Sequence, residues 1–145
     1  MKKPIFVVLK TSQNSVAINI DDLKFVTFNK NTKEMSVASS NHSVCCETES
    51  EDIPNLERSI RKRYNLVTIS DKITQETTKN AYSAVLKITS KDTDIYVWPR
   101  GLTTIAVSGP KITIGIHSLD PKIVELSRAP ELQNVLDTFK LLNIP

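Results

Sequence analysis

The sequence predicts an α+β protein that is mostly β and is built from two copies of one unit. Many short segments alternate apolar and polar residues, which is the pattern of half-buried strands. Two longer segments space their apolar residues three or four positions apart, as amphipathic helices do. Strands followed by a helix occur twice in the 145 residues. We therefore expect a tandem repeat of an antiparallel meander of four to five strands followed by one helix, with the copies packed in pseudo-twofold symmetry.

The repeat is visible when residues 7–39 are shifted by 77 positions (95 − 18) onto residues 84–116. Ile18 then falls on Ile95, and the apolar parity of the two segments is kept. A shift of 76 (130 − 54) aligns the two helical segments. The expected parts of one compact globule are a first unit at residues 1–64, a connecting segment at 65–83 and a second unit at 84–145.

In the first unit, period-two alternation is clearest at Val16, Ile18 and Ile20. A single apolar stripe then indicates a helix, with Pro54 suited to its first turn. The stripe consists of Ile53, Leu56, Ile60 and Tyr64. The strands expected before it are 5–10, 16–20, 23–28, 34–39 and 43–48.

The second unit repeats this order after a polar, Thr-rich connection, in which Leu66, Val67 and Ile69 are compatible with a short strand. A final helix is expected to start at Pro130 and to bury a strong apolar face. That face consists of Leu132, Val135, Leu136, Phe139 and Leu142. The strands expected in this unit are 84–89, 94–98, 102–107 and 111–116, with a weaker one at 123–126.

Composition is that of an ordinary globular chain, with 39% hydrophobic and 24% charged residues. The formal charge of +3 is compatible with nucleic acid or an acidic partner and requires neither. Near the N-terminus the apolar run Ile5–Leu9 is too short for a signal peptide or a membrane span. We expect a cytoplasmic, intracellular protein that does not enter a membrane.

A candidate binding surface lies where the two units differ. The alternation that turns Ile95 toward the core places Tyr96 and Trp98 on the opposite face of the strand. With Lys87 and Arg100 expected nearby, two such rings form a platform on which bases could stack. The alternative is that this face is covered, so that the rings belong to the core or to an interface with another protein.

A basic cluster near the end of the first helix is the second candidate, because a groove that binds phosphates needs several cations on one surface. It contains Arg58, Arg61, Lys62 and Arg63. The alternative is a solvated helix face, partly neutralised by the acidic run at residues 47–52. Further cations that could contribute are Lys2, Lys3, Lys24, Lys30 and Lys33.

Catalysis and metal binding are not indicated by the sequence. His42 and His117 are the only histidines, and neither has the spacing of a metal site or an activated nucleophile. The adjacent Cys45 and Cys46 supply too few ligands for structural zinc. Three glycines in the whole chain cannot form a glycine-rich phosphate loop. We expect no enzyme, no metal and no cofactor.

The predicted function is therefore non-catalytic binding of single-stranded nucleic acid through an aromatic and basic surface. The alternative is a protein-interaction or assembly subunit, such as a viral or phage accessory protein, whose aromatic face forms a homodimer or partner interface. In element order, the two strand-then-helix units resemble the PUR repeat and Whirly families. Those families bind nucleic acid, but the resemblance rests on element order alone, and fold analogy does not carry function.

Overall fold

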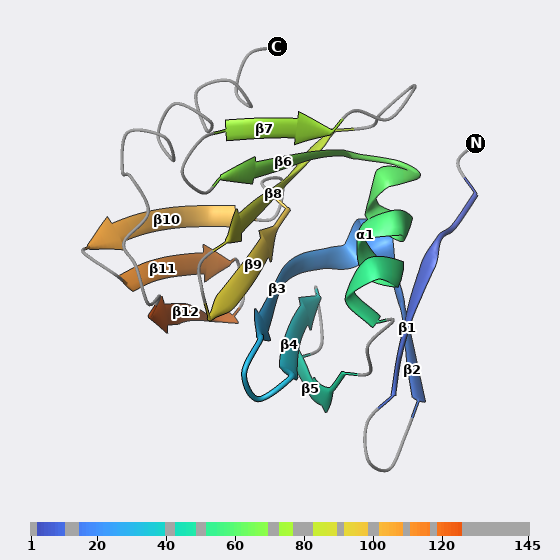
Figure 1. Cartoon of the computed structure of the whole chain (residues 1–145), viewed down its shortest axis with the longest axis horizontal. Helices are drawn as coiled ribbons and strands as arrows, with labels where there is room; N and C mark the ends of the chain where they lie inside the picture. The colour runs from blue at the N-terminus through green and yellow to red at the C-terminus, as the bar shows by residue number, and fades with distance from the viewer. Residues whose placement is uncertain are drawn as a thin grey trace.

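In a computed structural model, the described part of the chain consists mainly of strands, with one α-helix packed on the face of a sheet (Figure 1). Its α+β, mostly β class confirms the fold class predicted from the sequence. The structure describes residues 3–10, 15–39, 43–48, 52–69, 73–76, 83–89, 92–98, 102–108, 111–116 and 119–125. The second predicted helix, from residue 130, lies outside these ranges.

The strands follow the predicted alternation closely. In the first part of the chain they are β1 (Phe6–Lys10), β2 (Ser15–Asn19), β3 (Leu23–Asn29), β4 (Glu34–Ser39) and β5 (Ser43–Glu47), with the short 3-10 helix η1 (Ile20–Asp22) before β3. The helix α1 (Asp52–Arg61) comes next. The remaining strands are β6 (Asn65–Ile69), β7 (Ile73–Glu76), β8 (Ala84–Thr89), β9 (Thr93–Val97), β10 (Leu102–Ser108), β11 (Lys111–Ile116) and β12 (Leu119–Glu125).

These strands form three sheets. Seven of them pair in the order β5-β4-β3-β9-β8-β6-β7, β1 pairs with β2, and β10, β11 and β12 pair in sequence order. Strands β6 and β8 are parallel, whereas the other described pairs are antiparallel. The segment predicted as a connection between units therefore supplies two strands of the largest sheet.

The two predicted repeat units do not occupy equivalent places. The hairpin β1–β2 forms a sheet of its own, whereas the hairpin β8–β9 lies inside the seven-stranded sheet. Strand β9 joins the halves of the chain by pairing with β3, for example Val26 with Tyr96. The tandem repeat, its pseudo-twofold axis and the division at residues 65 and 84 remain predictions.

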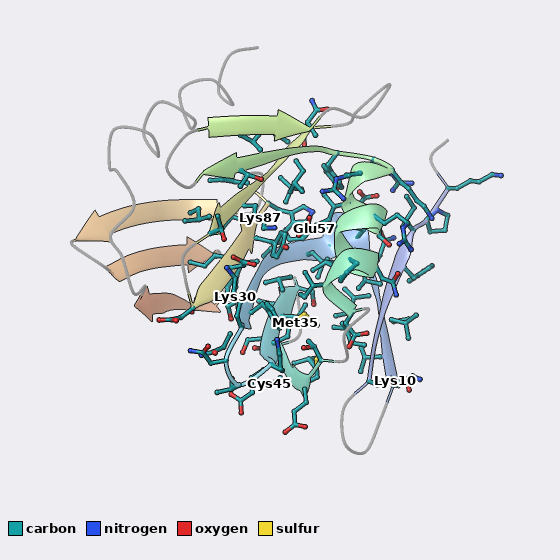
Figure 2. The ribbon with its side chains drawn as sticks, in the orientation of Figure 1. Lys10, Lys30, Met35, Cys45, Glu57 and Lys87 are labelled. Carbon is teal, nitrogen blue, oxygen red and sulfur yellow. The ribbon has the colours of Figure 1, made fainter. Side chains whose placement is uncertain are left out.

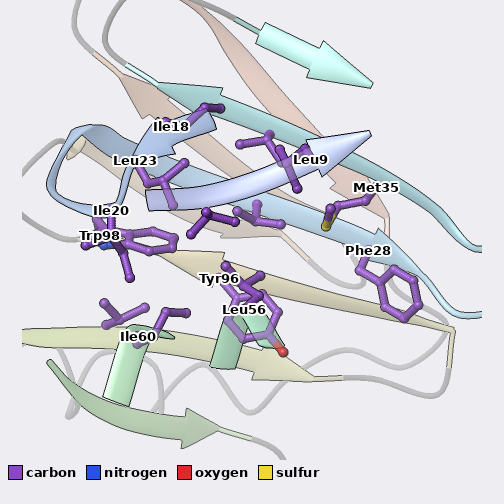
Figure 3. Close-up of a cluster of buried hydrophobic side chains, with 14 of the residues drawn as sticks. Leu9, Ile18, Ile20, Leu23, Phe28, Met35, Leu56, Ile60, Tyr96 and Trp98 are labelled. Carbon is purple, nitrogen blue, oxygen red and sulfur yellow. The ribbon is translucent and has the colours of Figure 1, made fainter. Parts of the chain in front are cut away.

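One face of the seven-stranded sheet is covered by α1 and the β1–β2 hairpin. The predicted stripe of α1 faces the sheet, with Leu56 and Ile60 buried. From the hairpin, Leu9 and Ile18 point into the same core (Figure 3). Asp52 begins the helix, where a carboxylate is favourable at the positive end of the helix dipole.

The other face of this sheet is also buried along the central strands. Along β9, Ile95 and Val97 lie opposite Tyr96 and Trp98 because successive side chains alternate between faces. All four are buried. In Figure 1, the sheet β10–β11–β12 lies on the other side of β8 and β9 from α1. The central strands are therefore sealed on both faces.

Within the part of the chain that the structure describes, no helix is long and apolar enough to cross a membrane.

Candidate nucleic-acid interface

Of the two interpretations of Tyr96 and Trp98, burial in the core is the one that the structure shows. Trp98 is 4% exposed and Tyr96 is fully buried. The predicted parity is correct, since both rings lie on the face opposite Ile95. That face is covered by α1 and the hairpin, and Figure 3 shows both rings among the core side chains. A base cannot stack on rings that the fold already covers.

Tyr96 instead belongs to a buried polar cluster centred on Glu57 of α1. Lys87 Nζ donates to Glu57 Oε2 at 2.7 Å, and the Tyr96 hydroxyl donates to the same oxygen. Arg61 Nη2 donates to Glu57 Oε1 at 3.0 Å, one turn along the helix. The Lys87 ammonium also lies 5.5 Å from the centre of the Tyr96 ring. Figure 2 shows Lys87 and Glu57 meeting between β8 and α1.

The cluster keeps Glu57 ionised. Burial opposes the charge, but the hydrogen bonds from Lys87 and Tyr96 and the charges of Lys87 and Arg61 together outweigh it, so the pKa of Glu57 lies below its usual value. Burial, followed by the hydrogen bond to Glu57, raises the pKa of Tyr96 well above its usual value. Tyr96 is therefore a neutral donor to a charged acceptor at neutral pH.

The structure thus brings together three predicted site residues, Lys87, Tyr96 and Arg61, around one carboxylate, with Tyr96 buried and Arg61 partly exposed. Their common partner is the Glu57 carboxylate, with which both cations form an ion pair. The cluster joins α1 to β8 and β9, and we assign it a role in positioning the helix on the sheet.

A second cluster fixes the start of the chain to the end of α1. Arg63 is 9% exposed, and its guanidinium donates to the Asp21 carboxylate and to the Lys3 carbonyl. The Tyr64 hydroxyl donates to the other oxygen of Asp21. Arg63, predicted as part of a basic surface, therefore points inward and is neutralised.

Two predicted cations remain on the surface, Arg58 in α1 and Lys62 directly after the last residue of that helix. Arg58 and Lys62 are exposed and lie four residues apart, on one side of the helix end. Arg58 donates to the Asn55 side-chain oxygen at 2.9 Å, and neither cation forms an ion pair with a described residue. We call Asn55, Arg58 and Lys62 the α1 basic surface. Arg100, the remaining predicted site residue, lies outside the described residues.

An exposed apolar pair on β1 was not predicted from the sequence. Phe6 is 53% and Val8 is 59% exposed. Val8 lies opposite the exposed Ala17 of β2. The alternation within Phe6–Lys10 could have predicted this exposure. Val7 and Leu9 pack inward, so the residues that alternate with them, Phe6 and Val8, point outward.

No group of side chains that could hold a metal ion occurs among the described residues. Cys45 is exposed, with its Sγ 3.3 Å from Ser36 Oγ, and burial raises the pKa of the Cys46 thiol. His42 and His117 lie outside the described ranges.

Comparison with known proteins gives no family for this chain. The sequence matches no protein-family model and no curated protein sequence. One solved structure is similar, the LytTr DNA-binding domain of a methyl-accepting/DNA response regulator from Bacillus cereus. It is 11% identical, covers 99% of this chain and 100% of its own, and has a TM-score of 0.48. A likeness at this level carries no argument about function.

Proposed function

We propose that the protein is a non-catalytic nucleic-acid-binding protein that contacts the phosphate backbone through the α1 basic surface. The observation that carries this proposal is the pair of exposed cations, Arg58 and Lys62, on one side of the helix end, neither of which forms an ion pair with a described residue. The two residues lie four positions apart across the end of α1, so both side chains can reach one nucleic-acid backbone.

The contrast with the cations that form ion pairs supports this proposal. Arg61 and Lys87 share Glu57, Arg63 is paired with Asp21, and Lys30 lies 3.0 Å from the buried Asp94. Neutralised cations stabilise the fold and attract a polyanion weakly, whereas exposed unpaired cations release counterions when phosphates bind.

Single-stranded nucleic acid remains the proposed partner, but the aromatic residue proposed to stack on a base is Phe6 in place of Tyr96 and Trp98. Phe6 is the large exposed ring of the described part of the chain. It lies three residues after Lys3, whose carbonyl is held by Arg63 just beyond α1. A base from a strand that follows the α1 basic surface could stack on this ring, which adds about 1–3 kcal/mol per base.

The test is fluorescence anisotropy of labelled single-stranded and duplex oligonucleotides as a function of salt. The double variant Arg58→Gln/Lys62→Gln should bind more weakly, and its salt slope for a single strand should fall by about 1.4, which is 0.7 for each lost phosphate contact. Phe6→Ala should weaken single-strand binding and leave duplex binding unchanged.

The matched control is Lys10→Gln/Lys33→Gln, which removes the same charge from two exposed positions outside α1. If this control loses as much affinity as the α1 variant, binding depends on overall charge and the proposed surface is wrong.

The second candidate function is protein interaction, as an assembly or accessory subunit, and the exposed apolar pair Phe6 and Val8 favours it. Absence of oligonucleotide binding at low salt would select this candidate. A homodimer and a cytoplasmic location also remain proposals.

A further inference from the structure

The two hairpins of the chain have the same internal pairing. Val8 pairs with Ala17 in β1–β2, and Lys87 pairs with Tyr96 in β8–β9. Lys87 lies 79 positions after Val8, and Tyr96 lies 79 positions after Ala17 (87 − 8 and 96 − 17). A shift of 79 positions therefore places the residue pairs of the first hairpin on those of the second. The strand β2 therefore corresponds to β9.

The strand pair that follows each hairpin also corresponds. The pairing of β3 with β4 is interrupted between Leu23 and Phe25, and the pairing of β10 with β11 is interrupted between Leu102 and Thr104. These irregularities are again 79 positions apart (102 − 23 and 104 − 25). Because such an irregularity is a specific local feature of a strand, β10 corresponds to β3.

The two sets of corresponding strands differ in one respect, which is how their outer edges are paired. Strand β9 pairs with β3, whereas their counterparts β2 and β10 have no such neighbour among the described strands. Each of the two ends its sheet. Unpaired edges expose backbone donors and acceptors that readily bind another strand.

The backbone of β2 has the right orientation to accept a strand. Ile20 N donates to Ile5 O at 2.8 Å, which fixes the alternation of the hairpin hydrogen bonds. Because this pattern repeats every two residues along the strand, the backbone groups of Ile18 and Val16 also face β1, opposite Val7 and Leu9. The N–H and C=O groups of Ala17 therefore point away from β1, as those of Tyr96 point toward β3.

We propose that β2 of one molecule pairs antiparallel with β10 of a second copy of this chain. The register follows from the pair Val26 and Tyr96 shifted by the same offset, which places Ala17 opposite Ile105 (96 − 79 and 26 + 79). The contact uses different edges on the two molecules, so copies add head to tail.

Sedimentation velocity over a concentration series tests the proposal. The wild type should form species larger than a monomer as concentration rises. Ala17→Pro removes the outward N–H without removing a β1–β2 hydrogen bond, so this variant should stay monomeric. Ala17→Thr keeps the N–H and should associate as the wild type does. An Ala17→Pro protein that associates like the wild type would overturn the proposal.

A mixing experiment distinguishes this contact from one between two β2 strands. Ala17→Pro blocks β2, and Ile105→Pro blocks β10, so each protein alone should be monomeric. A mixture retains one intact β2 and one intact β10 for each pair and should give heterodimers only. Association of Ile105→Pro alone would show that β10 is not the partner strand.

A peptide with the sequence of residues 102–108 provides a measurement that does not depend on the folding of the Ile105 variant. It should compete with self-association of the wild type. The same peptide methylated on the backbone nitrogen of residue 105 should not compete. Equal competition by both peptides, or a wild type that is monomeric at every concentration, would overturn the proposal.

Discussion

At the scale of single residues, the Glu57 carboxylate connects side chains from three elements of the fold. It accepts hydrogen bonds from a lysine, an arginine and a tyrosine that come from a helix and two strands. A buried charge with several donors is costly to disturb, because removing one partner leaves the others without compensation. The cluster is thus a specific contact between α1 and the sheet.

The low pKa of Glu57 predicts a pH-dependent stability. Its folded pKa lies below the usual value of 4.5, so its contribution is complete above that pH and is lost as the pH falls through the folded pKa. At pH 7, Glu57→Gln should lower the free energy of unfolding by about 2–3 kcal/mol. The difference from the wild type should shrink below about pH 4.5, as measured by urea unfolding.

The control for this prediction is Glu47→Gln, on an exposed position at the end of β5. It should change the free energy of unfolding by no more than about 0.5 kcal/mol. A constant difference between Glu57→Gln and the wild type from pH 7 to pH 3 would contradict the assignment of the charge to Glu57.

At the scale of elements, the β1–β2 hairpin is an amphipathic two-stranded sheet. Leu9 is 4% exposed and packs into the core, whereas the adjacent Val8 is 59% exposed. A two-stranded hairpin is marginal by itself, so this hairpin depends on its contact with α1 and the large sheet.

Neighbouring alanine substitutions test this dependence. Leu9→Ala should lower the free energy of unfolding by about 2–4 kcal/mol, because it removes buried methyl groups and leaves a cavity. Val8→Ala should change it by about 0.5 kcal/mol or less. Chemical denaturation measures both. Equal effects would mean that the hairpin does not pack on the core with its Leu9 face.

Most strands could be predicted from the sequence because period-two alternation is a local property. The sequence left open whether Tyr96 and Trp98 are exposed or buried, because that depends on what covers the second face of the sheet. A local signal existed nonetheless. The run Ile95–Tyr96–Val97–Trp98 contains no charged residue, and uninterrupted apolar runs are typical of strands buried on both faces.

The candidate site was predictable only in part. The sequence indicated a cluster of cations on the first helix, but helical spacing alone could not show which of them find a carboxylate. Arg63 is neutralised by Asp21, 42 residues earlier in the chain, and Lys87 by Glu57, 30 residues earlier. Only the tertiary fold shows that Arg63 and Lys87 are paired with carboxylates, whereas Arg58 and Lys62 are exposed.

At the scale of the whole molecule, the position of Trp98 gives a spectroscopic prediction. As the sole tryptophan and a core residue, it should emit at short wavelength and resist quenching by iodide in the native protein. Oligonucleotides that bind the α1 basic surface should leave this emission unchanged, in contrast to direct stacking. Strong quenching by oligonucleotides would show that the indole is accessible and would restore the aromatic surface on β9.

The pairing of β3 with β9 has a consequence for how this chain can fold. Strand β3 ends at Asn29, and its neighbour β9 begins at Thr93, so the middle of the large sheet is closed by segments more than 60 residues apart (93 − 29 = 64). During synthesis, the edge of β3 that pairs with β9 therefore stays unpaired until β9 has left the ribosome. Contacts of this range slow folding, and a fragment that stops before β8 would lack the strands that complete the interior.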